Sequence, residues 1–137
     1  MDFQTFNYQL TILERHLDTF GHMNNATYLQ IYEESRWDFI TKNGFGLDRI
    51  QELKLGPVIL DLHLTFKKEI KNREQITITS KVTEIKNPLV SSLRQEMRNE
   101  NGDLCSTLEL SVGLMDLQKR KLIPPTDDWK KAVGMVD

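Results

Sequence analysis

Residues 18–28 read Asp18-Thr19-Phe20-Gly21-His22-Met23-Asn24-Asn25-Ala26-Thr27-Tyr28. Before them, polar and apolar side chains alternate over residues 5–13, which is the period of a half-buried strand. From about Asn25 onward, apolar side chains recur every three or four residues, which is the spacing of one helix face. Residues 18–28 are therefore a strand-to-helix junction. This junction places the carboxylate of Asp18 beside the free backbone N–H groups of a helix N-terminus.

The helix predicted after this junction has recognisable ends. Asn24 or Asn25 is of a residue type that caps a helix start, and Asn43-Gly44 predicts the helix end. The predicted face consists of Ala26, Leu29, Tyr32, Glu33, Arg36, Phe39 and Ile40. Because apolar or aromatic side chains occupy most of its circumference, we expect this helix to be largely buried. A short second helix is expected at about residues 47–53, before Gly56-Pro57.

Strand periodicity returns in the second half of the chain. The alternating segments are residues 60–67, 76–82, 89–100 and 104–114. Ile85 breaks the alternation, which predicts a bulge near Thr83-Glu84. Asn101-Gly102 predicts a two-residue hairpin turn. Because the connections between these strands are short, we expect them to form an antiparallel meander.

The predicted elements add up to a two-layer α+β domain over residues 1–137, with one long helix against an antiparallel sheet of about five strands. Pro124-Pro125 ends the regular part, and Asp127 is expected to cap a short terminal helix that contains Trp129. The apolar strand faces are expected to bury against the long helix. A single helix cannot cover every sheet edge, so a long edge strand favours sheet extension between subunits, most simply in a two-fold dimer.

Composition narrows the class of protein. Hydrophobic residues make up 39% and charged residues 28% of the 137 residues, which is typical of a globular domain rather than a disordered chain. The net charge of −2 and the absence of a basic stripe argue against nucleic-acid binding. Cys105 is the single cysteine and excludes an intramolecular disulfide. The chain has no apolar run of the ~20 residues that a membrane span needs and no signal-peptide pattern, so we expect a cytoplasmic protein.

The junction also carries a resemblance to a known family. Together with Tyr32-Glu33-Glu34-Ser35-Arg36, residues 18–28 resemble the 4-hydroxybenzoyl-CoA thioesterase-like family and the related acyl-acyl-carrier-protein thioesterases, which share its pattern of Asp, His, Asn-Asn and Tyr. Met115-Asp116-Leu117 is similar to the last strand of that family. The order of predicted elements looks like the hotdog fold, in which an antiparallel sheet wraps around one long central helix.

The resemblance implies hydrolysis of an acyl-CoA thioester, without a metal or other cofactor, in a site between two subunits of a homodimer or a homotetramer (a dimer of dimers). By the same resemblance Asp18 either attacks the thioester carbonyl or activates a water, and the sequence leaves these two mechanisms open. The backbone N–H near Asn25 would polarise the thioester oxygen. His22 would orient the substrate or Asp18, or donate to the carbonyl, while Asn24 and Tyr28 would contact the substrate. An acyl-CoA substrate implies a role in lipid metabolism.

Each of these residues also has a structural interpretation. Asp18 is of a type that is common before helices, Tyr28 is more often a core aromatic, and Glu33 and Arg36 form an ordinary i,i+3 pair. A related hotdog family uses a helix glutamate as its catalytic acid, which makes Glu33 a second candidate. A set of basic residues also has two interpretations: they are either solvated strand ends or ligands of the coenzyme A phosphates. These residues are Lys67, Lys68, Lys71, Arg73 and Lys119-Arg120-Lys121.

Other function classes lack their motifs in this chain. The three histidines His16, His22 and His63 form no metal-ligand spacing, and no serine lies in a G-x-S-x-G context. Hotdog dehydratases that resemble the acyl-carrier-protein enzymes carry a His-Phe-Pro loop, which is absent here. Two alternatives to an acyl-CoA thioesterase stay open: an acyl-acyl-carrier-protein thioesterase, and a non-catalytic hotdog protein that binds an acyl thioester.

Overall fold

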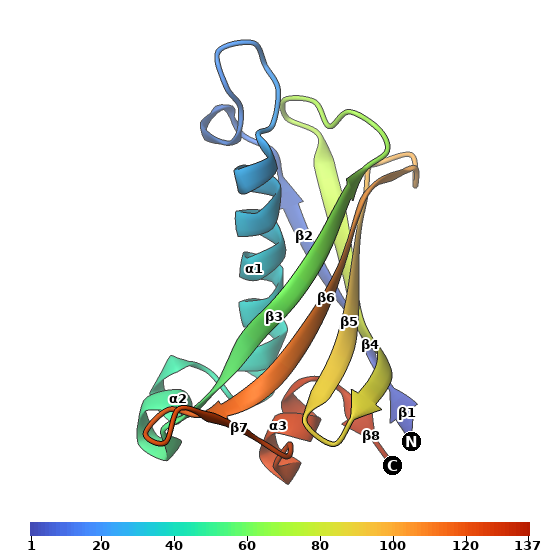
Figure 1. Cartoon of the computed structure of the whole chain (residues 1–137). Coiled ribbons are helices and arrows are strands. Elements are labelled where there is room, and N and C mark those ends of the chain that lie inside the picture. Colours follow the sequence, from blue (N-terminus) through green and yellow to red (C-terminus); the bar gives the residue numbers. More distant parts are fainter.

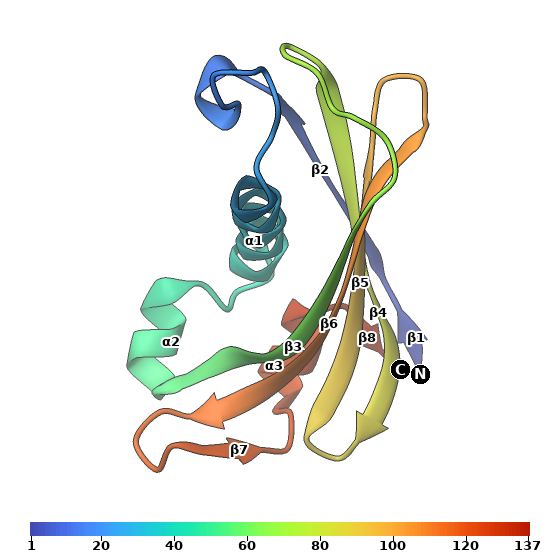
Figure 2. The same cartoon turned by 45° about the horizontal axis from the view of Figure 1, so that its top comes forward.

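A long helix and a curved antiparallel sheet form the two layers of the structure, a computed structural model that describes residues 1–137. Figure 1 shows the helix α1 along one face of the sheet, and Figure 2 shows the two layers from another side. The elements are β1 (Asp2–Phe3), β2 (Thr5–Thr11), the 3-10 turn η1 (Glu14–His16), α1 (Asn25–Lys42), α2 (Leu47–Leu53), β3 (Leu55–Phe66), β4 (Gln75–Asn87), β5 (Val90–Arg98), β6 (Leu104–Asp116), β7 (Lys121–Ile123), α3 (Asp127–Ala132) and β8 (Met135–Val136). The predicted two-layer α+β architecture is confirmed.

The strand order differs from the predicted meander. The main sheet has the order β2-β4-β5-β6-β3, with β7 paired to β6, while β1 and β8 form a separate two-stranded sheet. β3 therefore pairs with β6 and not with its sequence neighbour β4, and the prediction that β3 belongs to the meander was wrong. The connection 67–74 forms no tight hairpin turn: the N–H groups of Lys67 and Lys68 both donate to the carbonyl oxygen of Cys105 on β6 (2.8 and 3.1 Å).

Local strand features were predicted with mixed success. The bulge expected at Thr83-Glu84 is confirmed, because the register of β4 on β5 shifts between Val82 and Glu84. The two-residue hairpin at Asn101-Gly102 was wrong: residues 99–103 all lie between β5 and β6. The side chain of Asn99 explains the longer loop, since its Oδ1 accepts hydrogen bonds from the backbone N–H groups of Asn101 and Asp103 (both 3.0 Å).

The bounds of the long helix are as the sequence predicts, but its buried face is narrower. The buried residues are Tyr28, Ile31, Tyr32, Ser35, Phe39 and Ile40. Tyr32, Phe39 and Ile40 were predicted on this face, whereas Ala26 is exposed and Leu29 is half-buried. The helix packs on the sheet with one face only, so the expectation of a largely buried helix was wrong.

Both short helices lie where they were predicted, and one has a different cap. α2 spans the expected residues 47–53. α3 contains Trp129 as expected, but its cap is Thr126 and not Asp127: the hydroxyl oxygen of Thr126 accepts a hydrogen bond from the backbone N–H of Trp129 (3.2 Å). Thr126 has the extended backbone of a cap, whereas Asp127 already belongs to the helix.

One buried amide fixes the position of α1 on the sheet. The side chain of Gln95, on the central strand β5, is fully buried. Its Nε2 donates to the carbonyl oxygen of Tyr32 (3.1 Å) and to the hydroxyl of Ser80 (2.9 Å), and its Oε1 accepts from Nη1 of Arg36 (2.9 Å). Gln95 thus binds two residues of the helix and one of β4. Burial lowers the pKa of the Arg36 guanidinium, because removal from water disfavours its charged form. The hydrogen bond to the amide oxygen of Gln95 offsets part of this cost.

Other buried polar groups are also paired. The hydroxyl of Tyr32 donates to Oγ of Ser106, whose own hydroxyl donates to the carbonyl oxygen of Thr65 (both 2.9 Å). Burial raises the pKa of the Tyr32 hydroxyl, so it stays protonated as this donor. The thiol of Cys105 is fully buried, and burial raises its pKa as well. None of the helices has the length and hydropathy of a membrane-spanning segment.

We predict that Gln95→Leu destabilises the fold by about 2–4 kcal/mol, because it leaves the half-buried guanidinium of Arg36 and the buried hydroxyl of Ser80 without their partner. Urea unfolding followed by circular dichroism measures this loss. Gln9→Leu on the exposed side of β2 is the matched control, with an expected change within about 0.5 kcal/mol. Equal stability of the two variants would contradict the role of Gln95.

Candidate active site

The loop between β2 and α1 holds the carboxylate of Asp18 by one oxygen. Oδ1 of Asp18 accepts hydrogen bonds from the backbone N–H groups of Phe20 (2.9 Å) and His22 (3.0 Å). The backbone of Asp18 closes the loop by donating to the carbonyl oxygen of His22 (2.9 Å) and accepting from the N–H of Gly21 (3.0 Å). Gly21 has φ +78°, a conformation that favours glycine. Oδ2 of Asp18 has no hydrogen-bond partner, so one oxygen is fixed and the other is available.

The start of α1 leaves one backbone donor free. The Oδ1 atoms of Asn24 and Asn25 both accept from the N–H of Ala26 (2.8 and 2.9 Å). The N–H groups of Thr27 and Tyr28 both donate to the carbonyl oxygen of Asn24 (2.9 and 3.1 Å). Among the first N–H groups of the helix, only that of Asn25 has no partner. It lies at the positive end of the helix dipole, where it can donate to an oxygen that gains negative charge.

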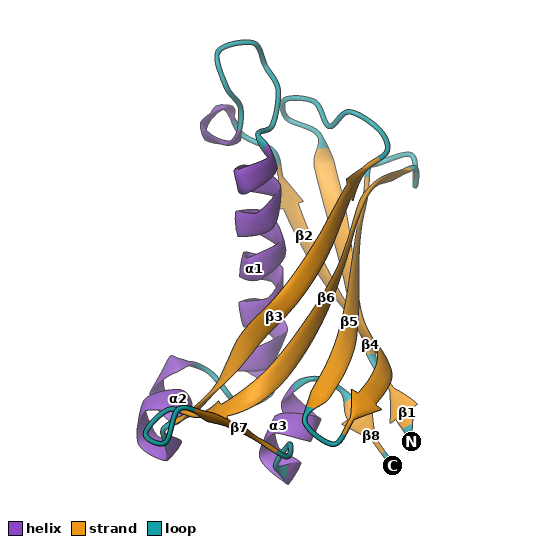
Figure 3. Ribbon diagram, viewed as in Figure 1, coloured by secondary structure: helices purple, strands orange, loops and turns teal.

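The side chain of His22 lies beside the 67–74 connection and forms no hydrogen bond with the Asp18 carboxylate. Its Nε2 lies 3.6 Å from Oε1 of Glu69, and both side chains are exposed. The backbone N–H of His22, and not its ring, therefore holds Asp18. Figure 3 shows the 12–24 loop and the 67–74 connection at the same end of the molecule. No sequence pattern predicted Glu69 at this position, because its contact with His22 depends on the path of the connection.

The 67–74 connection is tied to the chain before the Asp18 loop. The N–H of Arg73 donates to the carbonyl oxygen of Ile12 (2.7 Å), and Nη2 of Arg73 forms an ion pair with Glu14 (2.6 Å). Lys68 pairs with Asp103 (2.6 Å). Lys67 and Lys71 are exposed and form no ion pair, so these two cations of the connection are free to meet an anion.

Tyr28 is buried one turn into α1. Only 6% of its surface is exposed, and its ring packs edge-on against Phe66 with ring centroids 5.0 Å apart. Phe66, at the end of the edge strand β3, is itself 55% exposed. Burial raises the pKa of the Tyr28 hydroxyl. The structure therefore places Tyr28 in the core behind Phe66, and it does not bring Tyr28 into contact with Asp18 or His22.

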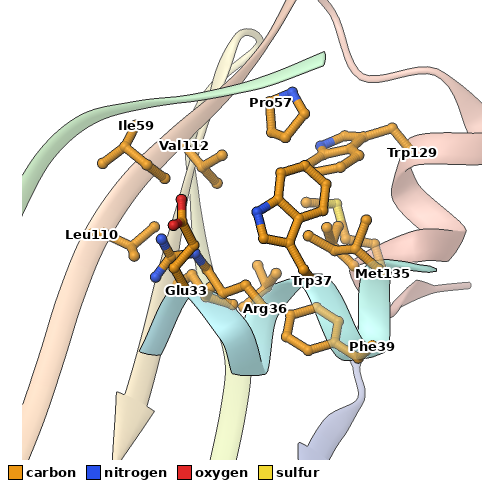
Figure 4. A pocket seen from close by; sticks show the side chains of 14 residues that line it. Glu33, Arg36, Trp37, Phe39, Pro57, Ile59, Leu110, Val112, Trp129 and Met135 are labelled. Atoms are coloured by element: carbon orange, nitrogen blue, oxygen red, sulfur yellow. The ribbon is translucent and has the colours of Figure 1, made fainter. Parts of the chain in front are cut away.

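An apolar cavity of about 80 Å³ lies farther along α1, toward its C-terminal end. Eleven of its 14 lining residues are hydrophobic, and they come from α1, the sheet, α3 and the residues that follow α3. Figure 4 shows Trp37, Trp129 and Pro57 on one side of this cavity and Glu33, Arg36 and Leu110 on the other. The sequence did not predict the cavity, because its walls come from segments that only the fold brings together.

A second hollow lies beside this cavity, nearer the start of the helix. Its lining residues are Leu29, Gln30, Glu33, Arg36, Leu62 and Leu108. Glu33 and Arg36 line both spaces. No group of three or more His, Cys, Asp or Glu side chains is placed to hold a metal ion.

The comparison with protein families fits this arrangement. The model of the thioesterase-like superfamily matches residues 13–133, which include the Asp18 loop, all of α1 and every residue that lines the two hollows except Met135. The chain belongs to the thioesterase-like superfamily. The resemblance inferred from residues 18–28 is thereby confirmed at the level of the family.

Relatives of this thioesterase-like chain include an enzyme of similar sequence and solved structures of the same fold. The long-chain acyl-CoA thioesterase FadM of Escherichia coli K12 is 27% identical over 77 residues, which cover 56% of this chain and 58% of FadM. A Staphylococcus aureus protein solved in complex with CoA is 21% identical, has a TM-score of 0.87, and is matched over 97% of this chain and 84% of its own. A DHNA-CoA thioesterase from the same organism is 23% identical and has a TM-score of 0.81. It is matched over 93% of this chain and 87% of its own. The predicted hotdog fold is confirmed.

We predict that the two asparagines at the helix start of this thioesterase-like chain are redundant caps. Asn24→Ala and Asn25→Ala should each cost less than about 0.5 kcal/mol, because the other side chain still accepts from Ala26, whereas the double variant should cost about 1 kcal/mol. Urea unfolding of the three variants tests this, with Asn72→Ala in the 67–74 connection as a control. Strictly additive losses would show that the caps act independently.

Proposed function

We propose that this protein hydrolyses an acyl-CoA thioester at the junction between the Asp18 loop and α1. The observation that carries the proposal is a pair of free groups on one short segment: Oδ2 of Asp18, which has no partner, and the N–H of Asn25, the only unpaired donor of the first helical turn. An acceptor for a proton and a donor for a developing oxyanion are the two groups that hydrolysis of a thioester requires.

The reaction uses water as the second substrate. Asp18 either takes a proton from a water that attacks the carbonyl carbon, or attacks that carbon itself to form an anhydride that water then cleaves. In both cases the carbonyl oxygen gains negative charge that the Asn25 N–H stabilises, and the carbon–sulfur bond breaks. The proton from water passes to the coenzyme A sulfur, so that a carboxylic acid and a free thiol leave. The ring of His22 is proposed to contact the substrate rather than Asp18.

The comparisons support coenzyme A as the carrier of the acyl group. FadM is named for long-chain acyl-CoA hydrolysis, and the Staphylococcus aureus neighbour was solved with CoA. Lys67 and Lys71 are exposed cations without an ion pair on the connection whose Glu69 meets His22, and we propose that they meet the CoA phosphates. Hydrolysis of fatty acyl-CoA would give the protein a role in lipid metabolism.

We further propose that two copies of the chain associate through β3. This strand spans 12 residues at the edge of the main sheet, and its outer side has no partner strand. Leu60 and Leu62 are 47% and 48% exposed, although the sequence predicted that they would be buried on the helix. Leu62 lines the open hollow beside α1, so the helix does not fully cover this edge strand. A second β3 would satisfy the edge and cover these side chains, and two such dimers would form the expected tetramer.

The first test of this function is thiol release from a panel of acyl-CoAs by wild type and Asp18→Asn. We expect Asp18→Asn to lower kcat by roughly 10²–10⁴-fold, because an amide is neither base nor nucleophile. Its thermal stability should be unchanged, because the amide oxygen of asparagine accepts the same two hydrogen bonds from Phe20 and His22.

Asp48→Asn is the matched control: it makes the same change in the first turn of α2, far along the chain from the proposed site, and should keep full activity. Equal activity of wild type and Asp18→Asn would refute the role of Asp18. Turnover of acyl-acyl-carrier-protein but of no acyl-CoA would reassign the substrate, and binding without turnover of either would favour a non-catalytic protein.

The proposed dimer predicts that Leu60→Lys converts the protein to a monomer, because two added charges would face each other at the paired edge strands. Sedimentation equilibrium measures the mass of each variant. Ile85→Lys, at a side chain of β4 that is 45% exposed, is the control and should keep the mass of the wild type. A wild-type protein that sediments as a single chain would disprove the association.

A further inference from the structure

The turn η1 connects a fixed point of the fold to the Asp18 loop. Ile12 is fully buried, and its backbone is held twice by the 67–74 connection. Its N–H donates to the carbonyl oxygen of Glu74 (2.9 Å), and its carbonyl oxygen accepts from the N–H of Arg73 (2.7 Å). Only residues 13–17 separate Ile12 from Asp18. Figure 3 shows η1 as the short helical segment between β2 and the loop that leads to α1. The conformation of this turn therefore sets where the Asp18 loop begins.

A histidine ring closes this turn. Nδ1 of His16 accepts a hydrogen bond from the backbone N–H of Leu13 (2.9 Å), while the backbone N–H of His16 donates to the carbonyl oxygen of Leu13 (2.9 Å). Nδ1 accepts only when it carries no proton, so the ring is neutral with its proton on Nε2. His16 is only 8% exposed. The closed turn thus depends on a buried histidine in its neutral form.

Protonation of this ring works against the closed turn in two ways. It replaces the acceptor Nδ1 by a second donor that faces the N–H of Leu13, which is then left without a partner. It also places a positive charge in a buried position. Opening of the turn relieves both costs, because the ring then reaches water. The ring of His16 therefore binds a proton more strongly in the open turn than in the closed one.

The charged groups around His16 act in opposite directions. Burial, followed by the positive charge of Arg15 in the same turn, lowers the pKa of His16, whereas Glu34 of α1 favours the charged ring. The carboxylate of Glu34 also accepts a hydrogen bond from the hydroxyl of Tyr8 on β2. Glu14, the other charged residue of the turn, is already in an ion pair with an arginine. Burial is the largest of these effects, so the closed turn keeps the ring neutral.

We propose that His16 is a positioning residue of the Asp18 loop: its neutral ring closes the turn before Asp18, and its protonation in acid opens that turn. The effect on turnover rests on the proposed hydrolysis, whereas the hydrogen bond between His16 and Leu13 does not. The closed turn is fully stable above the ordinary histidine pKa of about 6.5. Its stability is lost as the pH falls below that value, because the open turn takes up the proton first.

Hydrogen exchange of the Leu13 amide tests this role without any substrate. Its protection factor, measured by NMR at about pH 7.5 and about pH 5.5, reports how often the turn opens. In the wild type we expect protection to fall severalfold, and by at most about tenfold, because an ordinary histidine is about nine-tenths protonated at pH 5.5. His16→Gln should keep its protection at both pH values, since glutamine at this third position of a turn accepts the same N–H and does not titrate.

Two further variants complete this experiment. His16→Leu removes the acceptor and should have low Leu13 protection at both pH values. His63→Gln makes the glutamine change at an exposed histidine of β3 and should behave as the wild type does. Wild-type protection that is equal at both pH values would overturn the proposal. Equal protection of His16→Leu and wild type at about pH 7.5 would also overturn it.

The pH profile of turnover is the second test. The ratio of kcat for His16→Gln to kcat for the wild type, on whichever acyl-CoA is hydrolysed, should be close to one at about pH 7.5 and should rise severalfold at about pH 5.5. Only the wild type then releases the segment that positions Asp18. The same ratio for His63→Gln should stay close to one at both pH values. A His16→Gln ratio that does not change with pH would contradict the positioning of Asp18 by His16.

The two proposals fail separately. Hydrolysis by the wild type with pH-independent protection of Leu13 would keep the proposed function and remove the role of His16. Protection of Leu13 that falls in acid, without hydrolysis of any thioester, would keep the His16 turn and remove the proposed hydrolysis.

Discussion

The rest of the structure depends on how α1 lies across the sheet, and one amide on the central strand β5 fixes that position. Gln95 contacts α1 at a carbonyl oxygen and at the guanidinium of Arg36, and it also binds β4. These bonds set which helix face is buried and keep Arg36 turned toward the sheet. They also determine where the helix begins relative to the strands. The Asp18 loop and both hollows take their places from that single alignment.

Sequence patterns predicted what depends on neighbouring residues and missed what depends on distant ones. The ends of α1 were correct because caps act within one turn, at Asn24 and Asn43. The bulge after Val82 was correct because a bulge shifts the local alternation. The position of β3 was wrong because strand pairing is decided by the whole sheet, and a connection of moderate length, 67–74, permits pairing with β6 as well as with β4. The loop after Asn99 was also missed, although it is local. The side chain of Asn99 accepts two backbone hydrogen bonds and so stabilises a longer loop than the two-residue turn that Asn-Gly favours.

In the candidate site, too, sequence predicted the residues that lie on one segment and missed the contacts between segments. Asp18, Asn24 and Asn25 could be found from sequence because one segment carries both the carboxylate and the helix start. The sequence did not reveal that Asp18 is held by backbone N–H groups, nor that the two asparagines occupy one donor and leave another free. It also did not reveal the cavity, whose two tryptophans lie far apart in the chain. Side chains that converge from separate elements leave no periodic signal.

The buried thiol of Cys105 has a consequence for a protein that handles thioesters. A thioester transfers its acyl group readily to any accessible thiolate, and the released coenzyme A is itself able to form mixed disulfides. Cys105 is fully buried, and burial keeps it protonated by raising its pKa. The only cysteine of the chain is therefore shielded from self-acylation and from disulfide exchange with coenzyme A. Under the proposed function, substrate and released coenzyme A would both meet a protein surface that offers them no thiol.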